Sequence, residues 1–98
     1  MALPQNAQID ALFEAILKLE DREDCRLFLE DLCTVKEIRA LAQRLEIARR
    51  LDRGDSYVST VEHTGASSAT VSRVNRCLEY GPGGCRMMLK RLPALGED

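Results

Sequence analysis

Apolar residues recur at helical spacing through the first third of the chain. One set begins at Ile9 and a second follows the acidic segment at residues 20–24. Positions three and four residues apart share one face of a helix, and no glycine or proline lies between Pro4 and Gly54 to interrupt it. Two amphipathic helices are therefore predicted before residue 34. Their apolar positions are Leu12, Phe13, Ile16, Leu17, Cys25, Phe28, Leu29 and Leu32.

A third, longer helix is predicted after Thr34. Thr34 and Glu37 have the spacing at which a threonine hydroxyl and a glutamate carboxylate each bind an unpaired backbone N–H at a helix start. Gly54 can take the left-handed conformation that ends helices, so this helix extends to Arg53. Its apolar stripe consists of Ile38, Leu41, Leu45, Ala48 and Leu51.

Shorter helices are predicted in the second half, where all six glycines and two of the three prolines lie. Serine and aspartate favour the position before a helix, whereas glycine and proline favour its end. The predicted segments are a helix from Asp55 or Ser56 to about His63, a turn at residues 64–66, a helix from Ser67 to Leu78 or Glu79, and a last helix from Met87 to Leu92.

Composition supports one small all-α domain. The chain has 98 residues, of which 45% are hydrophobic, and only four are aromatic: two Phe and two Tyr. Few aromatic residues and many Leu, Ala, Glu and Arg favour helices over a sheet. A chain of this length has a thin core, and a partner subunit would enlarge it.

The net charge of −2 conceals a division along the chain. Residues 1–33 hold eight acids and three bases, a net −5, whereas residues 34–95 hold eleven bases and six acids, a net +5. Only the second part is suited to an anionic partner.

The residue types that most enzymes and metal sites require are scarce. The four cysteines, at positions 25, 33, 77 and 85, form no C-x-x-C pair, and His63 is the single histidine. We therefore expect no zinc or other metal site, no cofactor, no catalytic residues and no enzymatic activity. The thiols are expected to be reduced and to serve as small apolar residues, and His63 is expected at the surface.

A cytoplasmic location is expected. The first residues lack the layout of a signal peptide, and no apolar run approaches the length needed to cross a bilayer. We expect no membrane association.

Residues 64–78 have the pattern of a helix-turn-helix. A glycine turn separates two short helices, and Val71, Val74 and Leu78 can anchor the second helix to the body. The opposite face then carries small polar and cationic side chains, which suit a major groove. An ordinary helix hairpin with a solvated face is the alternative. The outward residues are Ser68, Ala69, Ser72, Arg73 and Arg76.

The first helix of this pair departs from the usual pattern. Thr60 and Thr64 stand where such motifs usually bury apolar side chains, which leaves the packing to Val58 and Val61. We expect this helix to be short and loosely held.

The chain resembles the Trp repressor-like family, and within it the YerC/YecD subgroup. The resemblance extends from about Phe28 to Leu92 and is most specific from Thr64 to Gly84, which includes Thr64-Gly65-Ala66-Ser67-Ser68-Ala69-Thr70-Val71-Ser72-Arg73 and Tyr80-Gly81-x-Gly83-Gly84. It implies a six-helix DNA-binding regulator of the repressor type that forms an intertwined homodimer on a palindromic operator in double-stranded DNA. The implied parts of a single domain at residues 1–98 are dimerisation helices at 1–33, a spine helix at 34–54, the helix-turn-helix at 55–79 and a last helix at 82–92. The residues expected to contact DNA are Ala66, Ser67, Ser68, Ala69, Thr70, Ser72, Arg73 and Arg76.

The resemblance also implies a pocket for a small effector. In the tryptophan-binding form the ligand lies between the spine and recognition helices, and the matching positions are Thr34, Arg44, Arg73, Val74 and Cys77. Two arginines can hold a carboxylate. Val74 replaces a glycine that leaves room for the indole ring, and Cys77 replaces a serine that can bind the ligand amine, so tryptophan is disfavoured. Arg44 could instead pair with Glu37 or Glu46, while Arg73 touches phosphate.

Two other readings of the chain remain open. One is a helical protein-interaction module whose helix-turn-helix no longer binds DNA. The other is a sensor of a small carboxylate other than tryptophan. Arg49, Arg50 and Arg53, at the end of the spine helix, could either stabilise its dipole or contact phosphate.

Overall fold

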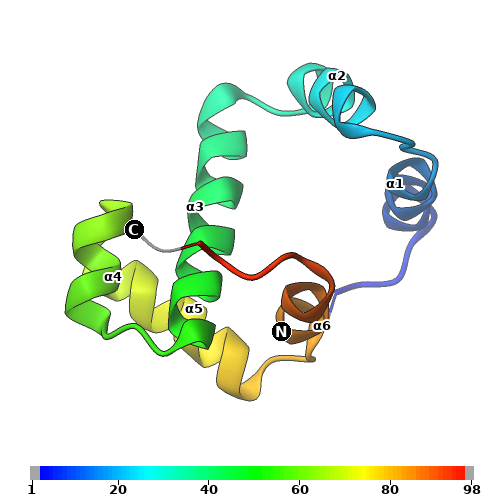
Figure 1. Cartoon of the computed structure of the whole chain (residues 1–98). Coiled ribbons are helices and arrows are strands. Elements are labelled where there is room, and N and C mark those ends of the chain that lie inside the picture. The colour runs from blue at the N-terminus through cyan, green and yellow to red at the C-terminus, as the bar shows by residue number, and fades with distance from the viewer. Residues whose placement is uncertain (1–2, 97–98) are drawn as a thin grey trace. The chain divides into compact units, whose positions relative to one another are not determined.

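The computed structural model describes residues 3–96, and in that range the chain forms six helices and no strand (Figure 1). The all-α prediction is confirmed. The helices are α1 (Ala7–Leu17), α2 (Arg22–Leu32), α3 (Val35–Arg53), α4 (Tyr57–Thr64), α5 (Ser68–Tyr80) and α6 (Gly84–Arg91). None of the helices in the described range is both long and apolar enough to span a membrane.

Polar side chains begin three of these helices as predicted. The Thr34 hydroxyl accepts from the Glu37 backbone N–H at 3.1 Å, and the Glu37 carboxylate accepts from the Thr34 N–H at 2.8 Å. This second bond, together with the Thr34 hydroxyl, lowers the pKa of the Glu37 carboxyl. Ser56 and Ser67 cap α4 and α5. Helix α6 begins at Gly84, earlier than the predicted Met87, because Gly83 takes a φ of +96° that turns the chain into the helix.

The chain divides into two compact units, one ending at Ile38 and the other beginning at Arg39. The N-terminal unit contains α1 and α2, and neither helix has a buried residue. The C-terminal unit contains most of α3 together with α4, α5 and α6. It also holds the hydrophobic core, so the two units differ sharply in how well their apolar side chains are covered.

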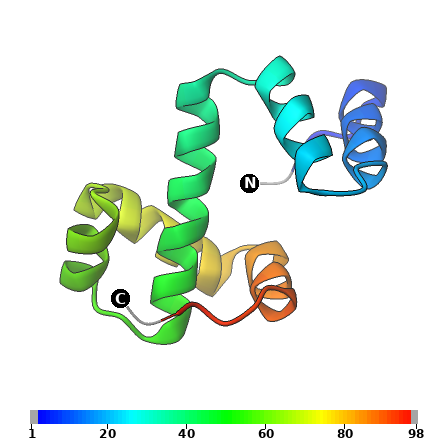
Figure 2. The ribbon, with the colours of Figure 1, turned by 45° about the horizontal axis from the view of Figure 1, so that its top comes forward.

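The core lies where α5 crosses the C-terminal half of α3 (Figure 1, Figure 2). Helix α5 contributes Val71, Val74 and Leu78, as predicted. On α3 the crossing buries Ala48 and the unpredicted Ile47, whereas Leu41 and Leu45 of the predicted stripe are 52% and 39% exposed. The stripe is only partly covered because α5 passes over one end of α3. The buried hydrophobic residues are Ile47, Ala48, Ala66, Val71, Val74 and Leu78.

Helix α4 packs through a threonine rather than through both predicted valines. Thr60 is fully buried, and its hydroxyl donates to the Ser56 carbonyl at 2.8 Å, which satisfies the buried polar group. Val58 is 69% exposed, so its predicted packing role is wrong, while Val61 does pack against the core. The helix has eight residues, which confirms that it is short.

Helix α6 is tied to the rest of its unit by Arg86. Its guanidinium donates to the Leu78 carbonyl of α5 at 2.9 Å and to the Asp52 carboxylate of α3 at 3.2 Å. Its other terminal nitrogen lies 3.5 Å from the Glu79 carboxylate. These contacts, together with the packing of Leu89 against the core, hold the start of α6 beside the end of α5.

Candidate nucleic-acid interface and the adjoining cavity

The turn between α4 and α5 is held by a glycine and by a side chain of α3. Gly65 has a φ of +72°, a conformation that glycine adopts without steric cost, and its N–H donates to the Val61 carbonyl at 2.9 Å. The Gln43 side-chain amide donates to the Thr64 carbonyl at 3.1 Å. These bonds place the start of α5 directly after the turn, in the arrangement of a helix-turn-helix.

The predicted recognition helix presents its small polar and cationic face outward. Ser67, Ser68, Ala69, Arg73 and Arg76 are exposed, whereas Thr70 and Ser72 are half-buried. Ala66 differs from the other candidates because it is only 5% exposed and its methyl group belongs to the core. At this position a bound partner would contact backbone atoms rather than a side chain.

Arg73 and Arg76 keep their charges free of internal partners. Within residues 3–96 neither guanidinium makes a hydrogen bond or an ion pair. The hydroxyls of Ser67 and Thr70 bond to each other at 3.0 Å between their oxygen atoms, and the Ser67 hydroxyl also accepts from the Thr70 N–H. The two arginines are therefore the strongest available donors on this face.

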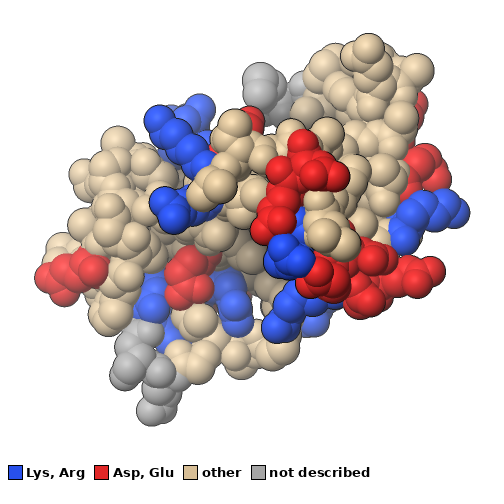
Figure 3. Space-filling model, turned by 90° about the horizontal axis from the view of Figure 1, so that it is seen from above, with Lys and Arg blue, Asp and Glu red and all other residues tan. Residues whose placement is uncertain are grey.

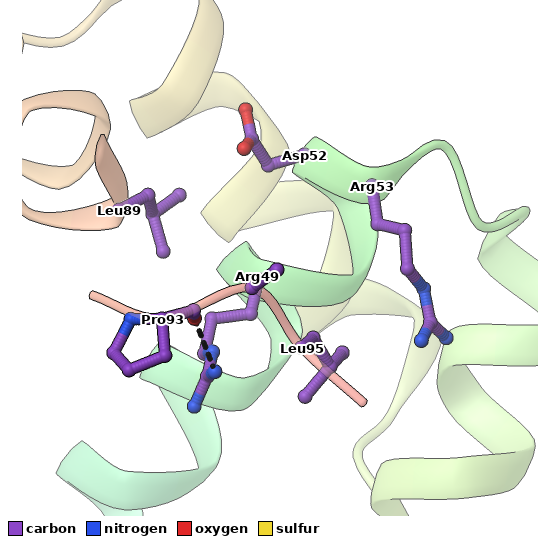
Figure 4. A pocket seen from close by; sticks show the side chains of 7 residues that line it. Arg49, Asp52, Arg53, Leu89, Pro93 and Leu95 are labelled. Atoms are coloured by element: carbon purple, nitrogen blue, oxygen red, sulfur yellow. Dashed lines mark hydrogen bonds between the residues drawn. The ribbon is translucent and has the colours of Figure 1, made fainter. Parts of the chain in front are cut away.

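The arginines at the end of α3 have structural partners instead. Arg50 is buried and bonds to the Glu46 carboxylate at 2.9 Å. Arg53 pairs with Asp55 at 2.7 Å and donates to the Gly96 carbonyl at 2.9 Å. Arg49 donates to the Pro93 carbonyl at 3.0 Å beside a cavity of about 290 Å³ (Figure 4). Arg49 and Arg53 thus bond to the segment that follows α6, whereas Arg50 bonds within α3.

A larger cavity of about 460 Å³ lies in the C-terminal unit and involves α3, α5 and the start of α6. Four of the five residues predicted for an effector pocket line it. The fifth, Thr34, belongs to the N-terminal unit, where it caps α3. The lining residues are Leu41, Arg44, Leu45, Thr70, Arg73, Val74, Cys77 and Cys85.

Arg44 does not pair with either acid considered from the sequence. Glu37 bonds to Thr34, and Glu46 bonds to Arg50. In the described part of the chain, the Arg44 side chain makes no hydrogen bond or ion pair. The cavity therefore holds two exposed, uncompensated guanidinium groups, which favour an anion.

Cys85 is a cavity residue that the sequence did not indicate. It lies just after Gly81-Pro82-Gly83-Gly84, and only the folding of α6 back beside α5 brings it to the cavity that Cys77 lines. All four cysteines are free. Cys25 and Cys33 are half-buried, but Cys77 and Cys85 are exposed, so the prediction that the thiols act as small apolar residues is wrong for this pair.

Charge elsewhere is divided between the two signs. On the face drawn in Figure 3, basic side chains lie beside acidic ones at several places, and the remaining surface is uncharged. His63 is exposed, as predicted. The described residues contain no group of three His, Cys, Asp or Glu side chains placed to hold a metal ion.

Comparison with known proteins gives consistent matches over nearly the whole chain. Residues 7–93 match the model of the family called Trp repressor protein. The uncharacterized protein YerC of Bacillus subtilis (strain 168) is 52% identical over 85 residues, which cover 87% of this chain and 82% of that protein. Two solved structures share the fold. A candidate Trp repressor from Staphylococcus aureus has a TM-score of 0.89 at 44% identity, covering 95% of this chain and 93% of the other. A TrpR-like protein from Eubacterium eligens ATCC 27750 has a TM-score of 0.90 at 43% identity, covering 95% and 96%.

Proposed function

The chain belongs to the Trp repressor family, and on that premise we propose that it is a cytoplasmic DNA-binding transcriptional regulator that acts as a homodimer on a two-fold symmetric operator. The observation that carries this proposal is the outward face of α5, where Arg73 and Arg76 have no partner among the residues that the structure describes. A regulator of this kind needs a helix held by its apolar face and free to enter a groove with its polar face.

The residues proposed to contact DNA divide by what they offer. Arg73 and Arg76 can bind phosphate or the edge of a guanine. Ser67, Ser68, Ala69, Thr70 and Ser72 are small enough to let the backbone of α5 approach the bases, and the position of Ala66 offers its backbone. In a homodimer the two copies of α5 would reach half-sites separated by about one helical turn or a multiple of it.

Selection of bound duplexes from a random pool, followed by fluorescence anisotropy on the selected sequence, tests this proposal. We expect Arg76→Ala to weaken binding by about 1–3 kcal/mol if Arg76 contacts a base, without unfolding the protein. Raising the salt concentration should also weaken binding steeply, because each neutralised phosphate releases counterions.

Arg26→Ala is the matched control, because it removes the same charge from a residue that already pairs with Glu23 and Glu30 on α2. Its DNA affinity should equal that of the parent. If Arg73→Ala and Arg76→Ala both bound the selected duplex as tightly as the parent, α5 would not be the recognition helix. A dimer that bound no duplex even at low salt would support the protein-interaction module instead.

The cavity favours a second function, that of a sensor for a small carboxylate. Arg44 and Arg73 are the proposed anion ligands, and Val74 and Cys77 occupy the positions that disfavour tryptophan. The volume of about 460 Å³ is in the range of small-molecule sites. Calorimetry against a panel of small carboxylates tests this function, and the absence of any heat of binding would discard it.

A further inference from the structure

The cavity in the C-terminal unit combines cysteine and arginine side chains, of which only Arg73 is also proposed to contact DNA. The thiols of Cys77 and Cys85 line it from α5 and from the start of α6. The guanidinium groups of Arg44 and Arg73 line it from α3 and α5. The two cysteines are eight positions apart along the chain, and it is the placement of α6 that brings both to one cavity.

Each of these groups is open to a ligand. Both thiols are free and exposed. Both arginines are exposed and make no hydrogen bond or ion pair within residues 3–96. Leu41, Leu45 and the buried Val74 supply apolar surface in the same cavity. A molecule that carries an anionic group, an apolar part and a thiol-reactive sulfur would meet all three kinds of lining residue.

We propose that this cavity is a site of covalent thiol modification by small anionic disulfides. The guanidinium groups of Arg44 and Arg73 hold the anionic group, and the sulfur of Cys77 or Cys85 attacks the disulfide. This inference deepens the effector site proposed above and rests on it, but the reaction does not require DNA.

The reaction is a single thiol–disulfide exchange. The cysteine thiol loses its proton to solvent, and the thiolate attacks one sulfur of the bound disulfide. The sulfur–sulfur bond of the ligand breaks and a mixed disulfide with the protein forms. The cysteine sulfur is oxidised, and the departing half of the ligand is reduced and leaves as a thiolate, so no further oxidant is needed.

The test uses the full chain with Cys25→Ser and Cys33→Ser, which leaves only the two cavity thiols. Two probes are compared: dithiobis(nitrobenzoate), an anionic disulfide, and dithiodipyridine, a neutral one. The rate of thiol release is measured by absorbance for the folded protein and for the same chain in denaturant. We expect the folded-to-unfolded rate ratio to be about tenfold higher with the anionic probe, because hydrogen bonds from the two guanidinium groups to its carboxylates would hold it in the cavity.

Charge variants connect the reactivity to the cavity. Arg44→Gln with Arg73→Gln should abolish the preference for the anionic probe and leave the neutral probe's rate unchanged. Arg39→Gln, an exposed position of α3 outside the cavity lining, is the matched control and should keep the preference. Mass spectrometry should find the adduct on Cys77 or Cys85, and Cys77→Ser with Cys85→Ser should remove it.

Equal rate ratios for the two probes would overturn the proposal, as would a preference that survives the double arginine change. If those variants fail to fold by circular dichroism, high salt replaces them as the test. Salt should slow the anionic probe alone, and an unchanged rate would overturn the proposal. Because none of these readouts involves a duplex, failure here is distinguishable from a failure of DNA binding.

Discussion

Thr34 and Glu37 begin α3 through two reciprocal hydrogen bonds, and both bonds follow from residue types at a fixed spacing. The backbone N–H of Thr34 is the larger cause of the lowered pKa of the Glu37 carboxyl, and the Thr34 hydroxyl is the smaller one. Since the folded state lowers this pKa, the carboxylate stabilises the fold above the ordinary pKa of glutamate. That contribution is lost as the pH falls through the lowered value.

The pKa of Glu37, measured by carboxyl-carbon NMR titration, should therefore lie below that of an unstructured glutamate. Thr34→Ala should raise it only partly, because the backbone N–H donor remains, whereas Thr34→Ser should leave it nearly unchanged. An ordinary value in the parent protein, or no rise in Thr34→Ala, would contradict the reciprocal cap.

Ile47 is the fully buried residue of α3 that the predicted stripe omitted. Ile47→Ala should reduce the free energy of unfolding by about 2–5 kcal/mol, because it removes buried methyl groups and leaves a cavity. Val58→Ala, at a position that is 69% exposed, should change it by about 0.5 kcal/mol or less. Urea unfolding at one protein concentration measures both values. Equal effects of the two substitutions would contradict the burial of Ile47 in the core.

At the scale of elements, α4 and α5 depend on a glycine whose role is conformational. Gly65 has a φ of +72°, and a Cβ built there meets nothing within 4 Å. Gly65→Ala should therefore cost about 1–2 kcal/mol from the left-handed backbone alone. Gly84→Ala is the matched control, since a Cβ built at Gly84 also meets nothing within 4 Å but Gly84 has no positive φ. It should be neutral or stabilise by up to about 1 kcal/mol in thermal or urea unfolding.

The boundaries of the elements followed from local chemistry more closely than their packing did. Caps at Ser56 and Ser67 and the stop at Gly54 depend on residues a few positions apart, so they were predictable. The packing of α4 was not. Thr60 can be buried because its hydroxyl donates a hydrogen bond within its own helix. The hydrophobic pattern does not indicate that a polar side chain has such a hydrogen-bond partner.

At the scale of the whole molecule, the N-terminal helices leave much apolar surface uncovered. Neither α1 nor α2 contains a buried residue, and Phe13, Leu17 and Leu27 are 45%, 75% and 51% exposed. Exposed apolar surface on this scale is typical of an interface. It supports the proposed homodimer, in which a second copy would cover these helices.

Light scattering should accordingly give twice the chain mass of 11.0 kDa at micromolar concentration. Phe13→Glu should shift the protein toward the monomer, because a charge would be buried at the interface. Gln8→Glu adds the same charge at an exposed polar position of α1 and should remain dimeric. A parent protein that is a stable monomer would contradict the proposal.

The candidate site was predictable where it depends on one helix and unpredictable where several elements meet. Periodicity placed Val71 inside and Arg73 and Arg76 outside on α5. The ion pairs of Arg50 with Glu46 and of Arg53 with Asp55 also join residues only four and two positions apart. The place of Cys85 could not be predicted, because it reaches the cavity only where α6 folds back beside α5.

The sequence by itself determined the six helices, the caps of α3, α4 and α5 and the two faces of α5, because backbone hydrogen bonding and side-chain spacing act over a few residues. The tertiary structure decided which part of α3 is covered, which arginines line the cavity and which cysteines share it. Those outcomes depend on where α5 crosses α3 and where α6 returns, and such crossings bring together groups that are far apart along the chain.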